Sequence, residues 1–274
     1  MTIQDQTDVP AGLTFVDPST AGARYRVVLW AAPGEGKSVA AASAPGPILA
    51  ISADRPNAYR FARHKHAGTE IRETRYYGEQ TLADTYRYLR AHPEIETVIL
   101  DPFHNIYDVL VDRAPRRGDG DIDYTLVNKK LLGFLYSLRE FDVHVVIVAH
   151  EKLNDGKRGD GKLYPQLGGP SLINKVLAES DLVARVEREA AEDGDPDQTP
   201  RYVGQLDAGT RPIVCKQGTG ALGARREIDL SEWFTIEAGA LAPLPETDLP
   251  WSPDYEPEPE PDADGGQASL DVPA

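Results

Sequence analysis

The sequence predicts an α/β fold, in which a mainly parallel β-sheet is flanked by helices. Segments typical of strands alternate with segments typical of helices, and several strand segments are apolar on both faces, as in a parallel sheet. A glycine-rich turn at 31–38 joins the first apolar strand directly to a helix. Short strand segments late in the chain predict an antiparallel C-terminal extension of the same sheet.

Each expected strand is a short run rich in aliphatic residues, and each expected helix is a longer run with apolar residues on one stripe. The strands are expected at 25–30, 47–52, 71–77 (an edge strand), 96–101 and 143–149, and then near 181–186, 201–206 and 212–216. The helices are expected at 37–44, from 57 onward, at 81–91 with Thr81 as the cap, from Pro102, at 123–141 and at 171–179.

Composition limits the class of protein. The 274-residue chain has a formal net charge of −15 and a single cysteine, Cys215. One cysteine allows neither an intramolecular disulfide nor a cysteine-based zinc site, and it fits a reducing compartment. No run of residues is apolar for long enough to span a membrane, and the first ten residues lack the pattern of a signal peptide. We therefore expect a cytoplasmic protein with no membrane partner.

The acidity is concentrated at the C-terminus. Residues 242–274 contain nine acidic side chains, eight prolines and no Lys or Arg, so the rest of the chain has 35 acidic and 29 basic side chains. Alternating proline and like charge can neither form a helix nor bury a core. We therefore expect a loosely ordered N-terminal segment (1–24), a folded core (25–239) and a disordered, acidic, Pro-rich tail (240–274).

The turn at 31–38, AAPGEGKS, fits the phosphate-loop pattern with Ala31 in place of the first glycine. The glycines let backbone N–H groups surround phosphates, Lys37 would reach the β- and γ-phosphates, and the Ser38 hydroxyl would bind Mg²⁺. The alternative is a plain turn between a strand and a helix. With ATP and Mg²⁺ as the ligands, the predicted nucleotide-binding residues are Ala32, Pro33, Gly34, Glu35, Gly36, Lys37, Ser38 and Val39.

Asp101 ends an apolar strand, which is where phosphate-loop proteins hold the acid that binds Mg²⁺. The alternative is a helix cap. Because Pro102 stands where many ring-forming ATPases have a water-activating Glu, a general base must come from elsewhere. Asp54 follows the strand at 47–52 and is the candidate base, and its alternative role is to cap the turn before Pro56.

His150 ends the most apolar strand, at the same edge of the sheet, where a polar side chain can contact the γ-phosphate or the attacking water. Glu151 is the rival candidate for orienting the water, and a buried core histidine is the alternative interpretation of His150. The predicted catalytic residues are therefore Lys37, Asp54, Asp101, His150 and Glu151, with Ser38 and Asp101 as metal ligands.

Together these elements resemble the RecA-like P-loop ATPases, and in particular the phage nucleotide-binding proteins with a minimal RecA core that act in single-strand annealing. The resemblance rests on the phosphate loop, the strand VILD that ends at Asp101, the helix at 123–141 and the segment VVIVAHEK, and it covers about 25–234. It implies a slow ATPase, stimulated by DNA or by assembly into a homo-oligomeric ring or filament in the bacterial host cytoplasm. It also places Asp54 at the catalytic Glu of RecA-like enzymes and His150 at their γ-phosphate-sensing Gln.

The resemblance further implies that the loop after the sensor strand contacts single-stranded DNA. Lys152, Lys157, Arg158 and Lys162 can pair with phosphates, and Tyr164 can stack on a base. A flexible surface loop of mixed charge is the alternative.

RecA-like assemblies also supply basic side chains in trans to the ATP of a neighbouring subunit. Lys216, Arg225 and Arg226, which flank the glycine-rich turn at 217–224, are the candidates for this role. Ordinary surface charge explains them equally well.

The leading hypothesis is an ATP/Mg²⁺-dependent, single-stranded-DNA-binding protein of phage-type recombination, which anneals or pairs strands while ATP controls its grip on DNA. A small-substrate P-loop kinase is disfavoured, because no Arg-rich lid segment precedes the last third of the chain. A nucleotide-gated adaptor, such as a helicase loader, is the other alternative.

The acidic tail leads to a first testable expectation. If it competes with DNA for the basic loop, deleting 242–274 tightens single-stranded-DNA binding and raises the salt concentration that disrupts it. Binding titrations at several salt concentrations measure both effects. Unchanged affinity would leave solubility, or recruitment of a single-strand-binding or replication protein, as the role of the tail.

Overall fold

The computed structural model describes residues 24–55, 57–118, 120–154, 161–189 and 200–240. The chain divides into a unit of 1–241 and a unit of 242–274, and all described residues lie in the first. The predicted acidic tail thus lies outside the described residues, apart from Ala240. Within the described part, no helix is long and apolar enough to cross a membrane.

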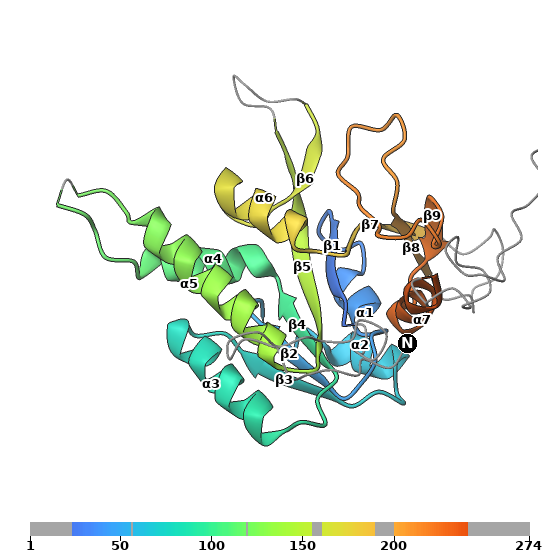
Figure 1. The fold of residues 1–274 in the computed structure, drawn as a ribbon, viewed down its shortest axis with the longest axis horizontal. Helices are drawn as coiled ribbons and strands as arrows, with labels where there is room; N and C mark the ends of the chain where they lie inside the picture. Colours follow the sequence, from blue (N-terminus) through green and yellow to red (C-terminus); the bar gives the residue numbers. More distant parts are fainter. Residues whose placement is uncertain (1–23, 56, 119, 155–160, 190–199, 241–274) are drawn as a thin grey trace, which may run out of the picture. The chain divides into compact units, whose positions relative to one another are not determined.

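The centre of the described part of the chain is a mixed, mostly parallel sheet of nine strands (Figure 1). Its order is β3 (Ile71–Arg75), β2 (Ile48–Ser52), β4 (Thr97–Asp101), β5 (His144–Leu153), β1 (Arg26–Ala31), β7 (Leu182–Glu189), β8 (Arg201–Gln205) and β9 (Arg225–Glu227), and β6 (Leu163–Pro165) pairs with β5 alone. The pairs from β3 to β7 are parallel, and β8 and β9 continue the sheet antiparallel. The predicted α/β class with a C-terminal antiparallel extension is confirmed.

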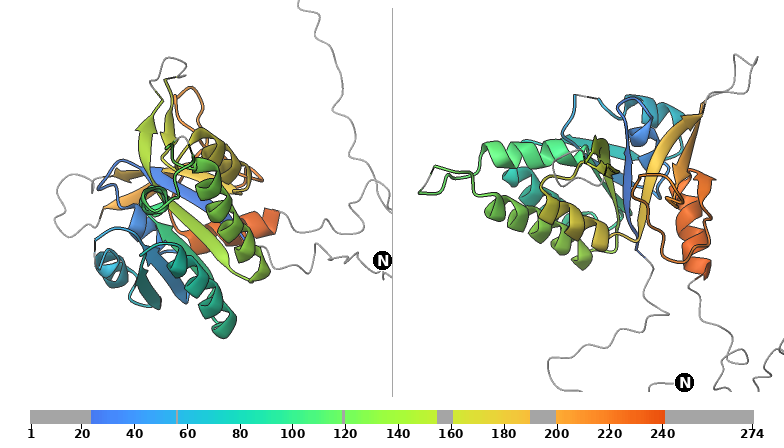
Figure 2. Two further views of the ribbon diagram at one scale, coloured as in Figure 1. Left: turned by 90° about the vertical axis from the view of Figure 1, so that its left-hand side faces the viewer. Right: turned by 90° about the horizontal axis from the view of Figure 1, so that it is seen from above.

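Helices cover both faces of this sheet (Figure 2). Strand residues alternate between two cores, because successive side chains of a strand point to opposite faces: Val28 and Trp30 belong to one core, and Val27 and Leu29 to the other. The first face is covered by α3 (Glu79–Ala91), α4 (Phe103–Asp112), α5 (Tyr124–Ser137, followed by the 3₁₀ turn Leu138–Glu140) and α6 (Pro170–Ala178). The second is covered by α1 (Lys37–Ala41), α2 (Arg60–Lys65) and α7 (Leu230–Ala240).

Several helix starts differ from the prediction. The helix expected from residue 57 begins at Arg60, because Asn57 has a left-handed φ of 61° that no helix residue adopts. Thr81 is not a cap, since α3 already begins at Glu79, and its hydroxyl instead accepts a hydrogen bond from the Tyr77 N–H (3.0 Å). Asp123 does cap α5, accepting from the Leu126 N–H at 3.2 Å.

The late part of the sheet also differs. Residues 212–216 form only single bridges, from Ile213 to Leu163 and from Lys216 to Val183, and the third antiparallel position is taken by β9. Proline at 212 has no N–H to donate to a ladder.

Helix α7 was not predicted from the sequence. Its signal was present, because Leu230, Trp233 and Phe234 have helical spacing after Asp229, whose carboxylate accepts from the Glu232 N–H at 3.1 Å.

A buried histidine at the start of β5 makes stability depend on pH. His144 accepts a hydrogen bond from the Tyr25 N–H (3.1 Å) and stacks on Phe234 with ring centroids 4.3 Å apart. Burial, and then the neighbouring Arg24, lowers the pKa of His144 to about 4. The unfolded chain takes up a proton at this histidine near pH 6.5, and the folded chain does so only near pH 4. The contribution of His144 to the free energy of unfolding is therefore fully present above pH 6.5 and is lost as the pH falls toward 4.

We predict that His144→Gln weakens this pH dependence, because glutamine retains an acceptor for Tyr25 but does not titrate. The loss of unfolding free energy between pH 6.5 and 4.5 becomes shallower by about 1 kcal/mol per pH unit. Urea unfolding at a series of pH values measures the slope. The control is His64→Gln, at an exposed position on α2, which leaves the slope unchanged. A wild-type slope in His144→Gln would contradict the prediction.

Candidate nucleotide-binding site

The phosphate loop leaves β1 at Ala31 and enters α1 at Lys37, as predicted. Gly34 and Gly36 have left-handed φ values of 86° and 79°, which suit glycine. A Cβ on Gly36 would also lie 1.9 Å from the Cε1 atom of Tyr202, a β8 residue, whereas one on Gly34 meets nothing within 4 Å. The antiparallel extension therefore closes one side of the loop. No motif marks Tyr202, and its place beside the loop was not predicted from the sequence.

Lys37 lies folded back across this loop. Its Nζ donates to the carbonyl oxygens of Ala31 (3.1 Å) and Ala32 (2.7 Å), and the side chain is buried. Burial lowers the pKa of Lys37, while the charges of Asp101, Glu151 and Glu35 act in the opposite direction. A desolvated cation held by weak carbonyl partners suits the phosphate-binding role predicted for it.

Ser38 and Asp101, the predicted metal ligands, are in direct contact. The Ser38 hydroxyl donates to Oδ2 of Asp101 at 2.5 Å, and the Tyr59 hydroxyl donates to the same oxygen at 2.8 Å. Burial raises the pKa of the Asp101 carboxyl, and these two hydrogen bonds and Lys37 oppose that rise. Tyr59, between β2 and α2, was not predicted from the sequence.

These two oxygens fit Mg²⁺. The ion prefers hard oxygen ligands, takes one or two from the protein, and completes its shell with water and phosphate oxygens. Among the described residues there is no group of three or more His, Cys, Asp or Glu side chains that could hold a metal by themselves. A hydroxyl and a carboxylate beside a phosphate loop match the sparse protein contribution that Mg²⁺ requires.

A cavity of about 520 Å³ lies over the loop. Six of the eight predicted loop residues line it: Pro33, Gly34, Gly36, Lys37, Ser38 and Val39. Ala32 supplies a carbonyl to Lys37 as above, and the Glu35 carboxylate accepts from the N–H of Arg188 at 3.1 Å. Asp101 and His150 also line the cavity, as does Asp54, which is exposed.

The cavity wall holds further residues that the sequence analysis missed. Arg55 and Arg188 bring cations to it, and Phe61 on α2 is 57% exposed beside it. An exposed aromatic face next to a phosphate loop suits stacking of a nucleotide base. The signals were weak, since an isolated Arg or Phe in a helical or loop segment marks no particular role.

The two candidates for orienting water separate in the structure. His150 lines the cavity, whereas the Glu151 carboxylate pairs with Arg185 at 3.2 Å. Burial lowers the pKa of His150 to about 4, with Lys37 and His104 acting in the same direction. His150 is thus neutral at pH 7.

The predicted trans-acting residues each have partners in their own chain. Lys216 donates to carbonyl oxygens at the C-terminal end of α6, including that of Ala178 at 3.1 Å. Arg225 pairs with Glu187 (3.1 Å) and Glu189, and Arg226 pairs with Glu232 (2.6 Å). A role in trans would require each of them to give up these contacts.

The predicted DNA loop begins as a β-hairpin. The strand expected to end at Ala149 continues to Leu153, because the backbone of its polar last residues, from Glu151 on, pairs with β6. Lys152 lies directly across the hairpin from Tyr164, and Lys162 is exposed just before the return strand β6. Lys157 and Arg158 lie outside the described residues.

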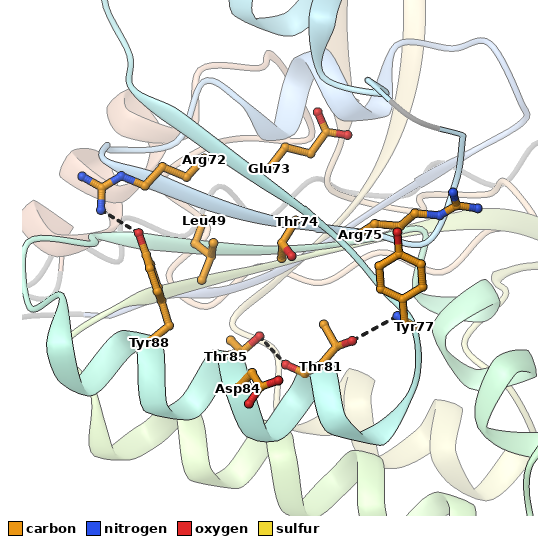
Figure 3. A pocket seen from close by; sticks show the side chains of 10 residues that line it. All are labelled: Leu49, Arg72, Glu73, Thr74, Arg75, Tyr77, Thr81, Asp84, Thr85 and Tyr88. Carbon is orange, nitrogen blue, oxygen red and sulfur yellow. Dashed lines mark hydrogen bonds between the residues drawn. The ribbon is translucent and has the colours of Figure 1, made fainter.

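A second cavity, of about 400 Å³, lies between the edge strand β3 and α3 (Figure 3). It shares no lining residue with the cavity over the phosphate loop. Arg72 of β3 donates to the Tyr88 hydroxyl of α3 at 2.8 Å, and this bond fastens α3 to the edge of the sheet. The Thr85 hydroxyl donates to the Thr81 carbonyl at 2.8 Å within α3 itself. Both contacts have a structural role.

A comparison with known families agrees with this geometry. The family described as an AAA domain matches residues 23–213, well over half of the chain. The chain belongs to the AAA domain family. This AAA domain contains the phosphate loop, Asp101 and His150, and the family identity supports nucleotide binding by a P-loop ATPase domain. No curated protein sequence matches the chain. The finer resemblance to phage annealing proteins stays a prediction.

We predict that Gly36→Ala destabilises the protein more than Gly34→Ala. Both changes force a left-handed φ on alanine, which costs about 1–2 kcal/mol, but only Gly36→Ala also places a methyl group in the ring of Tyr202. Adding Tyr202→Ala should therefore recover stability in the Gly36→Ala background and not in the Gly34→Ala background. Thermal unfolding of the two double-mutant cycles measures this coupling, and equal coupling in both would contradict the contact.

Proposed function

We propose that this AAA domain protein binds ATP and Mg²⁺ and uses the bound nucleotide to control a grip on single-stranded DNA, in phage-type recombination by annealing or strand pairing. One observation carries the proposal. Strand β5 runs without a break from His150 at the nucleotide cavity into the β5–β6 hairpin. The return strand is tied to the same point, because the N–H of Gln166 donates to the carbonyl of His150 at 2.7 Å.

The stem of the hairpin supports a nucleic-acid role. Cross-strand neighbours such as Lys152 and Tyr164 lie on one face, which puts a cation beside an aromatic ring, as binding of phosphates and unstacked bases requires. Both line a cavity of about 240 Å³ that Ile173 and Asn174 of α6 complete. The ion pair with Arg185 compensates the negative charge of Glu151 and so weakens the repulsion between this carboxylate and DNA phosphates.

In the proposed hydrolysis, Lys37 and the loop N–H groups hold the phosphates, and Ser38 and Asp101 hold Mg²⁺. Mg²⁺ held there would neutralise negative charge on the phosphate oxygens of ATP. Asp54 is the proposed acceptor of the proton from the attacking water. Asp54 lines the same cavity as His150 and Asp101, which supports this role. Neutral His150 is proposed to hydrogen-bond the water or the γ-phosphate.

Assembly of identical subunits into a ring or filament is part of the proposal. Oligomers on DNA would multiply the modest grip of one hairpin, because linked contacts act at high effective concentration. The acidic tail is proposed to compete with DNA or to recruit a basic replication partner.

A nucleotide-gated adaptor, such as a helicase loader, is the second candidate. Among the described residues that line the cavity, Asp101 is the only buried acid. A protein that binds ATP without hydrolysing it needs no second buried acid as a general base, and this favours the adaptor. Asp54→Ala separates the two functions. Loss of ATP turnover together with loss of DNA release favours the recombination protein, and unchanged partner loading favours the adaptor.

We predict that Lys152→Ala weakens single-stranded-DNA binding and lowers the slope of log K against log salt by about 0.7, the value for one phosphate contact. Lys129→Ala, an exposed lysine on α5, is the matched control and changes neither quantity. Fluorescence anisotropy with a labelled oligonucleotide at several salt concentrations measures both.

The same titrations are repeated with ATP and with Lys37→Ala. The nucleotide should change wild-type affinity for DNA and leave the Lys37→Ala variant unaffected. DNA binding that ignores both the nucleotide and Lys152 would refute the proposal.

A further inference from the structure

His104 is a buried histidine that lies against His150 of the nucleotide cavity, and none of the roles proposed above involves it. It lies in the first turn of α4, three residues after Asp101, and its ring is tilted by 45° against that of His150 with centroids 4.5 Å apart. The residue is only 8% exposed, and its Nδ1 has no hydrogen-bond partner among the described residues. A buried polar atom without a partner is energetically unfavourable. Such an atom beside a reactive site calls for an explanation.

The two histidines share one electrostatic environment. Burial lowers the pKa of each, the Lys37 ammonium lowers it further, and the Asp54 carboxylate opposes the effect on both. Both rings are therefore neutral at pH 7, each with one nitrogen that donates and one that accepts. Which nitrogen of a neutral histidine carries the hydrogen is set by the hydrogen bond that the other nitrogen makes.

His150 has no such partner as it stands, because no hydrogen bond to its ring is present among the described residues, and the neighbouring ring offers a nitrogen that is itself unpaired. We propose that His104 is a positioning residue that acts through His150: when nucleotide fills the cavity, the adjoining rings turn so that Nδ1 of His104 hydrogen-bonds a nitrogen of His150 and fixes which nitrogen faces the γ-phosphate. Active-site hydrogen bonds that are unformed or poorly aligned in the free protein commonly tighten when substrate binds. The contact is a hydrogen bond, and no proton is transferred. This inference rests on the proposed ATP hydrolysis at the cavity.

Two substitutions separate the nitrogen from the ring. His104→Phe retains an aromatic ring against His150 and removes the nitrogen, and His104→Asn places a polar atom near the position of Nδ1. We expect His104→Phe to lower kcat for ATP about tenfold or more with little change in KM, because misorientation affects the chemical step. His104→Asn should recover most of kcat. The control is His144→Gln, at the other end of β5, which leaves kcat unchanged at pH 7.5.

A second readout does not depend on turnover. Wild type should bind a β,γ-imido analogue of ATP more tightly than ADP, and His104→Phe should reduce this preference several-fold while its affinity for ADP stays the same. If wild type binds nucleotide without hydrolysing it, the proposed function fails, and a lost preference still supports the contact.

Two outcomes overturn the inference. One is wild-type kcat and wild-type nucleotide preference in His104→Phe. The other is equal loss in His104→Phe and His104→Asn, with both variants folded by circular dichroism, since a polar atom at this position would then have no effect.

Discussion

The hydrogen bond from Ser38 to Asp101 is the contact on which the rest of the site depends. Ser38 follows β1 and Asp101 ends β4, yet these strands are not neighbours, since β5 lies between them. The bond therefore reaches across the end of β5, and Tyr59 adds the segment after β2 to the same carboxylate oxygen. Without its donors, the buried Asp101 would carry a charge in a low-dielectric environment, which is unfavourable. The same donors that organise three strand ends also keep this acid suited to a metal.

The other wall of the site depends on a longer chain of contacts. Tyr202 reaches the loop from β8, and β8 is held against α7 at Gly204, where a Cβ would lie 2.4 Å from the ring of Trp233. The indole N–H of Trp233 donates to the Glu227 carbonyl of β9 at 2.9 Å, so α7 fixes both antiparallel strands. The shape of the phosphate loop thus rests partly on a C-terminal helix that lies outside the matched family region.

Local patterns made the parallel strands, the phosphate loop and Asp101 predictable, because each depends on a few consecutive residues. Contacts between distant segments were not predictable in this way. Tyr59, Tyr202 and His104 belong to no motif, and folding alone brings them to the loop. The same holds for Lys216 and Arg225, which look available in the sequence and are partnered in the structure.

The hairpin shows most clearly what only the fold reveals. Its strand was expected to end before His150, since the aliphatic run stops there, but backbone pairing continues through polar residues. The ladder of β5 with β4 ends at Ile147 and that with β1 ends at His150, so among the described strands the backbone of β5 beyond this point pairs only with β6.

The place where β5 leaves the sheet therefore coincides with the residue that lines the nucleotide cavity. A small backbone rotation at His150 would redirect the hairpin stem, because this is the last residue of β5 that pairs with β1. Two bonds limit the movement: Arg185 holds Glu151 at 3.2 Å, and the Leu163 N–H donates to the Pro212 carbonyl at 2.7 Å. Both connect the hairpin stem to the region of β7 and β8 that also contributes Arg188 and Tyr202 to the cavity. The hairpin stem is thus joined at His150 to one side of the nucleotide cavity and, through Arg185, to β7, which contributes Arg188 to the cavity. The proposed control of DNA binding by nucleotide requires such a connection.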